Sequence, residues 1–249
     1  MKQAIILVPT FNESATVGKL LDRVSVIRME LLELPQDSAI DLQLMIIDDN
    51  SPDQTADLVE DMALPWVSIL RRSAKMGLGP AYIAGFEKAL AEKFEYIIEM
   101  DADLSHQPEA LPSLLSPVIS GRAHLTIGTR WMPGGKVVNW PLTRQLISRA
   151  GTGYARLALG IDLRDITSGY RVFHRSVLES IDFKKIEAHG YGFQIEMVIK
   201  TLKNGFIIEE VPITFVEREG GVSKMSKKIV IEALWKVTIW GLQRFNKLR

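Results

Sequence analysis

The chain of 249 residues lacks cysteine, net charge and any long apolar run. Without cysteine it can form no disulfide, thiolate metal site or iron–sulfur cluster, and it has no cysteine nucleophile. Its 30 basic residues are balanced by 30 acidic ones, which argues against a nucleic-acid-binding protein with a basic surface. The apolar run at residues 4–8 stops at Pro9 and is too short for a signal peptide. No stretch reaches the roughly 18 apolar residues that span a bilayer.

The residues that are present predict one α/β domain followed by a basic tail. Hydrophobic residues make up 47% of the chain, which is enough to bury a sizeable core. Residues 223–249 contain seven basic residues and one acid, a net charge of +6, which leaves −6 for residues 1–222. We expect residues 1–222 to form the main domain and residues 223–249 a basic amphipathic helix. That helix either lies on an anionic lipid surface or packs on its own domain.

Short apolar runs alternate with helical patterns along the chain. We expect strands at residues 4–8, 42–47, 67–70, 96–100 and 125–129, because these runs are short, mostly aliphatic and end at polar turns. Residues 14–32, 53–62, 79–93 and 109–119 repeat apolar residues at helical spacing. Further along, we expect helices at 141–159 and 190–203 and extended segments at 170–174 and 206–215. The alternation predicts a Rossmann-like, mostly parallel sheet flanked by helices.

Acidic residues follow three of the expected strands. In an open parallel sheet, ligands bind beyond the carboxyl ends of the strands. Asp101 and Asp103 provide hard oxygen ligands that suit Mg²⁺ or Mn²⁺. An isolated Asp-x-Asp is more often a solvated turn, but this one follows a buried strand beside two other acidic clusters, which favours the metal. Asp49 suits a base or ribose, Glu13 either such a ligand or a helix cap, and Asp48 a structural turn.

The common phosphate-binding loops are absent. No Walker loop occurs and no Gly-x-Gly-x-x-Gly follows the first strand, which argues against a nucleotide-dependent oxidoreductase. Basic residues in the second half instead suit a second phosphate, provided that they converge. These residues are Arg130, Arg144, Arg149, Arg171, Arg218 and Lys224.

Together these motifs resemble the dolichyl- or polyprenyl-phosphate mannosyltransferases, which are inverting glycosyltransferases of family 2 with a GT-A fold. The matching segments, in the family's order, are residues 9–13, 47–53, 75–82, 100–106, 128–130, 139–141, 167–171 and 218–225. Asp-x-Asp alone indicates only a GT-A enzyme. The Ser-Gly-Tyr-Arg segment at 168–171 and the Ser-Lys-Met segment at 223–225 point to the polyprenyl-phosphate branch.

The resemblance implies a role for each matching residue. The nucleoside of GDP-mannose would bind Pro9, Phe11, Glu13, Ile47 and Asp49. The diphosphate would bind, through Mg²⁺ or Mn²⁺, at Asp101, Ala102 and Asp103. Arg218 and Lys224 would close over phosphates, and Arg130 with Arg144 would hold the lipid phosphate. Two positions depart from the family, because Phe11 replaces a frequent tyrosine and Gln54 replaces the usual glycine.

The implied reaction moves mannose from GDP-mannose to a dolichyl or polyprenyl monophosphate, giving a β-linked product. Such an acceptor is already anionic, so no general base is required, and we expect His106 to support the structure. Two alternatives remain open, a polyprenyl-phosphate glucosyltransferase using UDP-glucose and a non-catalytic nucleotide-sugar-binding subunit. We expect the protein in the cytoplasm, peripheral at the cytoplasmic face of a membrane, held there by its own surface or by a separate membrane-anchor subunit.

Overall fold

The computed structural model describes residues 1–188, 190–217 and 227–247, which form one large and one small sheet with helices around them. The large sheet contains, in spatial order, β3 (Val67–Arg71), β2 (Ile40–Asp48), β1 (Lys2–Thr10), β4 (Tyr96–Glu99), β7 (Arg171–His174), β5 (Leu125–Thr129) and β8 (Ile208–Pro212). The small sheet pairs β6 (Lys136–Val138) with β9 (Thr214–Val216). All neighbours in both sheets are parallel except β7, which runs antiparallel to β4 and β5.

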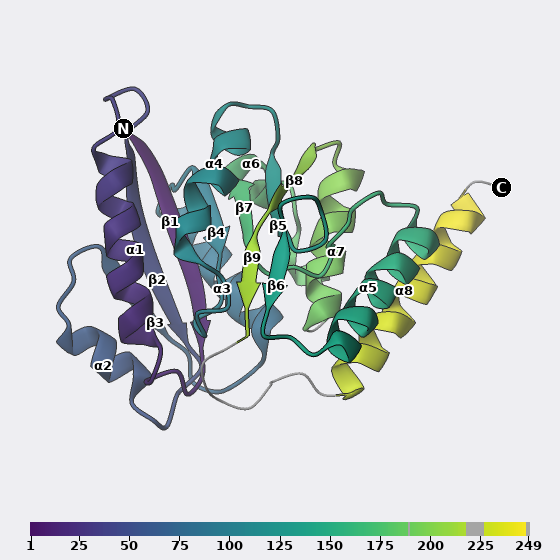
Figure 1. The fold of residues 1–249 in the computed structure, drawn as a ribbon, viewed down its shortest axis with the longest axis horizontal. Coiled ribbons are helices and arrows are strands. Elements are labelled where there is room, and N and C mark those ends of the chain that lie inside the picture. The colour runs from purple at the N-terminus through teal and green to yellow at the C-terminus, as the bar shows by residue number, and fades with distance from the viewer. Residues whose placement is uncertain (189, 218–226, 248–249) are drawn as a thin grey trace.

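Helices cover both faces of the large sheet (Figure 1). One face packs against α1 (Val17–Leu32), α2 (Thr55–Asp61) and α4 (Leu111–Ile119). The other packs against α3 (Leu78–Ala91), α5 (Leu142–Leu159), α6 (Arg175–Glu179) and α7 (Tyr191–Lys203). Along β1, Ile6 and Val8 enter the first core while Ile5 and Leu7 enter the second, because successive side chains of a strand point to opposite faces.

The five expected strands of the first half are confirmed, as is the mostly parallel sheet. The expected helix at 14–32 begins only at Val17, since residues 14–16 form a turn. The expected extended segment 206–215 is divided, because β8 ends at Pro212 on the edge of the sheet and β9 belongs to the small sheet. Proline removes a ladder donor, which explains this ending.

The terminal helix α8 (Lys227–Lys247) lies beside α5, at the end of the molecule opposite α1 and α2 (Figure 1). Its Val237 is 2% exposed, and a Cβ on Gly241 would lie 2.9 Å from the carbonyl oxygen of Ala158. Outward-facing Trp235 and Leu242 are 65% and 61% exposed. One side of α8 therefore packs on the domain while apolar side chains on the other meet solvent. Across the described ranges, no helix combines the length and apolar character of a membrane span.

Candidate active site

The polar ends of three parallel strands meet at one edge of the large sheet. Thr10 pairs in register with Asp48 and Leu7 pairs with Glu99, so β1, β2 and β4 end close together. The strand order reverses between β1 and β4, which is where open α/β sheets bind ligands. The structure therefore brings together the acidic clusters that the sequence predicts at the strand ends.

Asp48 holds the ends of β1 and β2 together. Its carboxylate accepts hydrogen bonds from the hydroxyl of Thr10 at 2.9 Å and from the backbone N–H and hydroxyl of Ser51 at 2.9 and 2.5 Å. The residue is 3% exposed. These contacts support the structural role expected for Asp48.

Asp53 organises the loop that carries Glu13. It accepts hydrogen bonds from the N–H of Ser14 at 3.0 Å and from the N–H and hydroxyl of Thr55 at 3.1 and 2.5 Å. Burial alone would raise the pKa of Asp53, but these hydrogen bonds outweigh it and lower the pKa below its ordinary value. The Thr55 hydroxyl also accepts from the N–H of Glu13 at 3.0 Å. Gln54, which replaces the family's glycine, adopts a φ of 63° and so retains a glycine-like turn.

Two predicted nucleoside residues, Phe11 and Asp49, meet the segment that follows β3. Asp49 is 5% exposed and accepts hydrogen bonds from the guanidinium of Arg72 at 2.5 Å and from the N–H of Met76 at 3.2 Å. The ammonium of Lys75 lies 3.9 Å from the ring centre of Phe11. The segment after β3 thus holds a carboxylate and an aromatic face at one wall of the site, through Arg72 on Asp49 and Lys75 on Phe11.

The structure places the side chains of Ile47 and Ala102 in the protein interior. They are 0% and 3% exposed. A Cβ on Gly85 of α3 would lie 2.5 Å from the Cδ1 atom of Ile47, so that side chain packs against α3. Pro9 is half-buried and pairs with Ile47 in register. Any ligand contact at Ile47 would therefore come from its main chain.

Asp101 and Asp103 lie just beyond β4. The side chain of Asp101 is 36% exposed, whereas Asp103 is 8% exposed and accepts a hydrogen bond from the N–H of Ser105 at 3.1 Å. A Cβ on Gly169 would lie 3.8 Å from Oδ1 of Asp101, so the loop before β7 closely approaches this carboxylate. The absence of a side chain at Gly169 keeps space beside the acid.

The donor atoms in this turn suit a hard divalent cation. Asp101 and Asp103 supply carboxylate oxygens, and the buried hydroxyl of Ser105 has no hydrogen-bond partner within the described part of the chain. No group of three or more His, Cys, Asp or Glu side chains with metal-binding geometry occurs there either. Mg²⁺ is usually bound by one or two protein carboxylates, and water and phosphate oxygens fill its other coordination positions. A structural zinc site, in contrast, has four protein ligands.

His106 supports this turn from the protein interior. It is 1% exposed, and its Nδ1 accepts a hydrogen bond from the N–H of Asp101 at 3.1 Å, which places the proton on Nε2. Its ring stacks on Tyr170 at 5.0 Å and meets Phe215 edge-on at 5.5 Å. Burial lowers the pKa of His106 to about 4, against the opposing charge of Asp103, so the ring is neutral at pH 7. The expected supporting role fits this geometry.

Arg171 is interior, which corrects the expectation that it suits a second phosphate. It is 0% exposed, and its guanidinium donates to the carbonyl oxygens of Ser168, Gln194 and Ile166 at 2.7, 2.9 and 2.8 Å. Its Nε also lies 3.9 Å from the buried carboxylate of Glu99. Burial lowers the pKa of Arg171 to about 10 and raises that of Glu99 to about 7. Arg171 therefore fastens the loop at 166–168 to the sheet.

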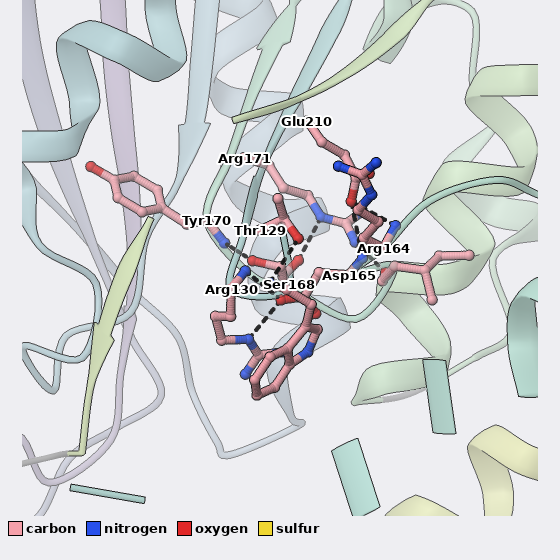
Figure 2. A network of polar contacts seen from close by, with 10 residues as sticks. Thr129, Arg130, Arg164, Asp165, Ser168, Tyr170, Arg171 and Glu210 are labelled. Atoms are coloured by element: carbon pink, nitrogen blue, oxygen red, sulfur yellow. Dashed lines mark hydrogen bonds and ion pairs between the residues drawn. The ribbon is translucent and has the colours of Figure 1, made fainter. Parts of the chain in front are cut away.

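Arg130 is held by a buried carboxylate (Figure 2). Its Nε and Nη2 each donate to Asp165 at 2.7 Å, and its backbone N–H donates to the same side chain at 3.0 Å. Asp165 is 0% exposed and Arg130 is 8% exposed. The guanidinium carbon of Arg130 also lies 5.2 Å from the ring centres of Trp140 and Phe215. This predicted phosphate-binding residue is thus fixed in position by the fold.

Arg130 and Arg144 line one pocket of about 240 Å³ between α5, α7 and α8. The guanidinium of Arg144 pairs with Glu217 and lies 4.1 Å from the ring centre of Trp140. Most of the remaining wall is apolar and includes Ile147, Ala155, Ile195, Ala233, Leu234 and Val237. Thr167 belongs to the same wall, two residues before the glycine that approaches Asp101. The structure thus combines two cations with an apolar cavity beside the strand edge.

Of the predicted residues, Arg218 and Lys224 lie outside the residues that the structure describes, and Arg149 lines a different pocket from Arg130 and Arg144. Sequence reasoning also missed two partners of predicted residues, Arg72 and Asp165. Arg72 directly follows a strand that ends beside β2, with Asp48 and Arg71 in register, so parallel pairing could have indicated its contact with Asp49. Asp165 lies 35 residues from Arg130, and no spacing pattern in the sequence links the two.

Comparison with known proteins agrees with this geometry. The model of the family described as "Glycosyl transferase family 2" matches residues 5–182. An "Undecaprenyl-phosphate mannosyltransferase" of Micrococcus luteus is 46% identical over 99% of this chain and 98% of its own length. A "Polyprenol monophosphomannose synthase" of Mycolicibacterium smegmatis is 41% identical over 100% of this chain and 91% of its own length.

Solved structures show the same fold at lower identity. Glucosyl-3-phosphoglycerate synthase from Mycobacterium tuberculosis in complex with UDP has a TM-score of 0.69 at 20% identity, covering 96% of this chain and 80% of that chain. Its complex with Mn²⁺, UDP and phosphoglyceric acid has a TM-score of 0.70 at 18% identity, covering 96% and 78%. The expected GT-A fold is confirmed. The chain belongs to glycosyl transferase family 2 and, within it, to the family of polyprenyl-phosphate mannosyltransferases.

Proposed function

We propose that this protein transfers mannose from GDP-mannose to a polyprenyl monophosphate with inversion at the anomeric carbon, using Mg²⁺ or Mn²⁺ at Asp101 and Asp103. The sugar and the acceptor class are supported by the full-length relatives, which are named as undecaprenyl-phosphate and polyprenol mannosyltransferases. The choice of GDP-mannose as the donor rests on the resemblance of the sequence motifs to this family.

The pocket of Arg130 and Arg144 carries the assignment of the acceptor. A polyprenyl phosphate has an anionic head and an apolar chain, and this pocket offers two guanidinium groups in a largely apolar wall. Thr167 connects the pocket to the loop whose Gly169 approaches Asp101. A phosphate held at the arginines would therefore lie toward the edge where the donor diphosphate is proposed to bind.

On the donor side, Phe11 and Asp49 supply an aromatic face and a carboxylate for the nucleoside, with Pro9, Glu13 and the main chain of Ile47 beside them. Asp49 is already hydrogen-bonded to Arg72, so a bound base would share or replace that contact. Arg218 and Lys224 are proposed to face the phosphates from the segment outside the described residues.

The chemistry needs no general base from the protein. The second pKa of a phosphate monoester is about 6, so the acceptor is a dianion in large part at neutral pH. Its oxygen forms a bond to the anomeric carbon while the bond to the diphosphate oxygen breaks, and GDP leaves with that electron pair. Mg²⁺ or Mn²⁺, when bound, neutralises the developing diphosphate charge. His106 is 1% exposed and its Nδ1 already accepts the N–H of Asp101, so it is not placed to act as a base. The chain's own residues therefore act by orienting the two substrates.

The test is sugar transfer by the purified full chain. It would be incubated with a short-chain polyprenyl phosphate, Mg²⁺ or Mn²⁺, and either GDP-mannose or UDP-glucose, and the lipid-linked sugar would be quantified. Product from GDP-mannose alone is the expected result. Product only from UDP-glucose would overturn the donor assignment, and no product from either donor would contradict the proposed activity.

Three variants separate the site from the fold. Asp101→Ala should lower turnover by at least about a hundredfold, the scale of losing one preorganised electrostatic group at a reacting centre. Asp57→Ala removes an exposed carboxylate of α2, which pairs with Arg71 of β3, and it should leave turnover unchanged. Arg144→Gln should raise the KM for the acceptor more than that for the donor. Equal effects of Asp101→Ala and Asp57→Ala would argue against a role for Asp101 in transfer.

A further inference from the structure

Helix α5 turns apolar side chains outward. Leu142, Leu146 and Leu157 are 75%, 67% and 81% exposed. They share one face, because positions 4 and 11 residues apart on a helix point in nearly the same direction. Its buried residues, Thr152, Ala155 and Leu159, face the domain. A helix that exposes three leucines on the side away from its buried face presents a surface suited to an apolar environment outside the protein.

Three arginines converge beside this face. Arg149, Arg156 and Arg164 line a pocket of about 290 Å³ together with Trp131, Thr152 and Gly153. The first two are seven residues apart on α5 and therefore project from the same side two turns apart. The guanidinium carbon of Arg149 lies 4.7 Å from the ring centre of Trp131.

Carboxylates offset only part of this charge. Arg156 pairs with Asp162, whose side chain is 89% exposed. Glu210 accepts hydrogen bonds from the backbone N–H groups of Arg164 and Asp165 at 2.8 and 3.0 Å, as Figure 2 shows. The pocket thus combines three exposed guanidinium groups with one side-chain ion pair among the described residues.

This arginine pocket differs from the proposed acceptor pocket. Arg130 and Arg144 line the apolar cavity against α8, and Thr152 of α5 is the one residue that lines both. The chain therefore has cationic groups on both flanks of α5, with the exposed leucines on the same helix.

We propose that the arginine pocket binds the headgroup phosphate of an anionic membrane lipid, with the exposed face of α5 lying in the interfacial layer of the bilayer. Arginine forks bind phosphate oxygens bidentately, and adjacent leucines gain by leaving water for the acyl boundary. An anionic bilayer surface offers phosphate and apolar material within one short distance, so it satisfies both features at once. Trp235 and Leu242 add exposed apolar side chains on α8, the helix that lies beside α5 (Figure 1).

Vesicle binding tests this proposal independently of the transfer activity, because the vesicles contain no prenyl phosphate. The full chain would be floated with vesicles of phosphatidylcholine alone or of phosphatidylcholine mixed with phosphatidylglycerol. The combined variant Arg149→Gln, Arg156→Gln and Arg164→Gln should lose roughly a hundredfold in affinity for the mixed vesicles, at about fivefold for each arginine near an anionic surface. Its binding of GDP-mannose and its Tm should match those of the wild type.

A control variant removes the same charge elsewhere. It combines Lys88→Gln, Lys93→Gln and Lys185→Gln, on and after α3 and in the 3₁₀ turn after α6. The affinity of this variant for the mixed vesicles should fall by less than about threefold, because salt screens the long-range attraction of charges that do not touch the lipid. An equal loss of vesicle affinity in both variants would show that net charge alone attracts the protein to the lipid, and it would overturn the assignment of the arginine pocket as a headgroup site.

Two further outcomes would also overturn the proposal. Arginine-dependent binding of inorganic phosphate alone, with an affinity equal to that for mixed vesicles, would assign the pocket to a free anion. A raised KM for a short, water-soluble prenyl phosphate in the triple arginine variant would assign the pocket to the acceptor.

A second variant, Leu146→Asn with Leu157→Asn, should weaken binding to both kinds of vesicle by about tenfold or more, since apolar burial does not depend on lipid charge.

Discussion

Replacing Asp165 removes the counter-ion of a buried guanidinium. Asp165 is 0% exposed, and both carboxylate oxygens accept hydrogen bonds from Arg130, at 2.7 Å each. Breaking a buried ion pair from one side costs about 3–5 kcal/mol, because the remaining charge stays desolvated. Asparagine keeps the shape and one acceptor, so we expect a loss of about 3 kcal/mol for Asp165→Asn and up to about 5 kcal/mol for Asp165→Ala.

The chain offers a matched control three residues earlier. Asp162 also pairs with an arginine, Arg156, but its side chain is 89% exposed. Exposed ion pairs contribute little, since both groups are solvated without each other. Asp162→Asn should therefore leave the free energy of unfolding unchanged within experimental error.

Urea unfolding followed by tryptophan fluorescence measures both variants, since Trp131 and Trp140 lie against Arg130. For a domain of this size, a loss of 3 kcal/mol lowers Tm by roughly 6–12 °C. A loss under about 1 kcal/mol for Asp165→Asn would refute the assumption that Arg130 stays buried and charged without its partner. A rise in the KM for the acceptor, measured where Asp165→Asn is still folded, would connect the same ion pair to acceptor binding.

Two further predictions concern backbone strain and pH. Gln54→Gly should raise the free energy of unfolding, measured in urea, by roughly 0.5–1 kcal/mol. Glycine relieves the left-handed φ of 63° at this exposed position, and this gain exceeds the extra chain entropy that glycine loses on folding. A lower free energy of unfolding would refute this. The pKa of His106 is lowered to about 4 in the folded protein, so the unfolded chain binds more protons between pH 6.5 and 4. This residue should therefore lower the free energy of unfolding by up to about 3 kcal/mol as the pH falls through that window. Thermal unfolding of His106→Asn, which keeps an acceptor for the N–H of Asp101, should show less loss toward low pH than the wild type, and an unchanged slope would contradict it.

Local patterns predicted much of the fold, while the partners of the site residues depended on distant contacts. The runs that became β1 and β2 are continuous in the sequence, and their parallel pairing follows from the helix between them. The same logic placed Asp49 and Asp101 at one edge. Arg171 was grouped with the basic residues that suit a phosphate, because buried arginines are rare and no local signal marks the three carbonyl groups that it binds.

The arginines of the second half show how the same residue type acquires different roles. Arg171 is surrounded by carbonyl groups and serves the fold, whereas Arg130 and Arg144 keep carboxylate partners at the wall of a pocket. A partner reduces the cost of holding a guanidinium out of water, and it also fixes the orientation in which an incoming phosphate meets that group. Since Glu217 is exposed in part, its pair with Arg144 can give way to a phosphate more readily than the buried pair of Arg130. The proposed acceptor site therefore combines one fixed cation with one exchangeable cation.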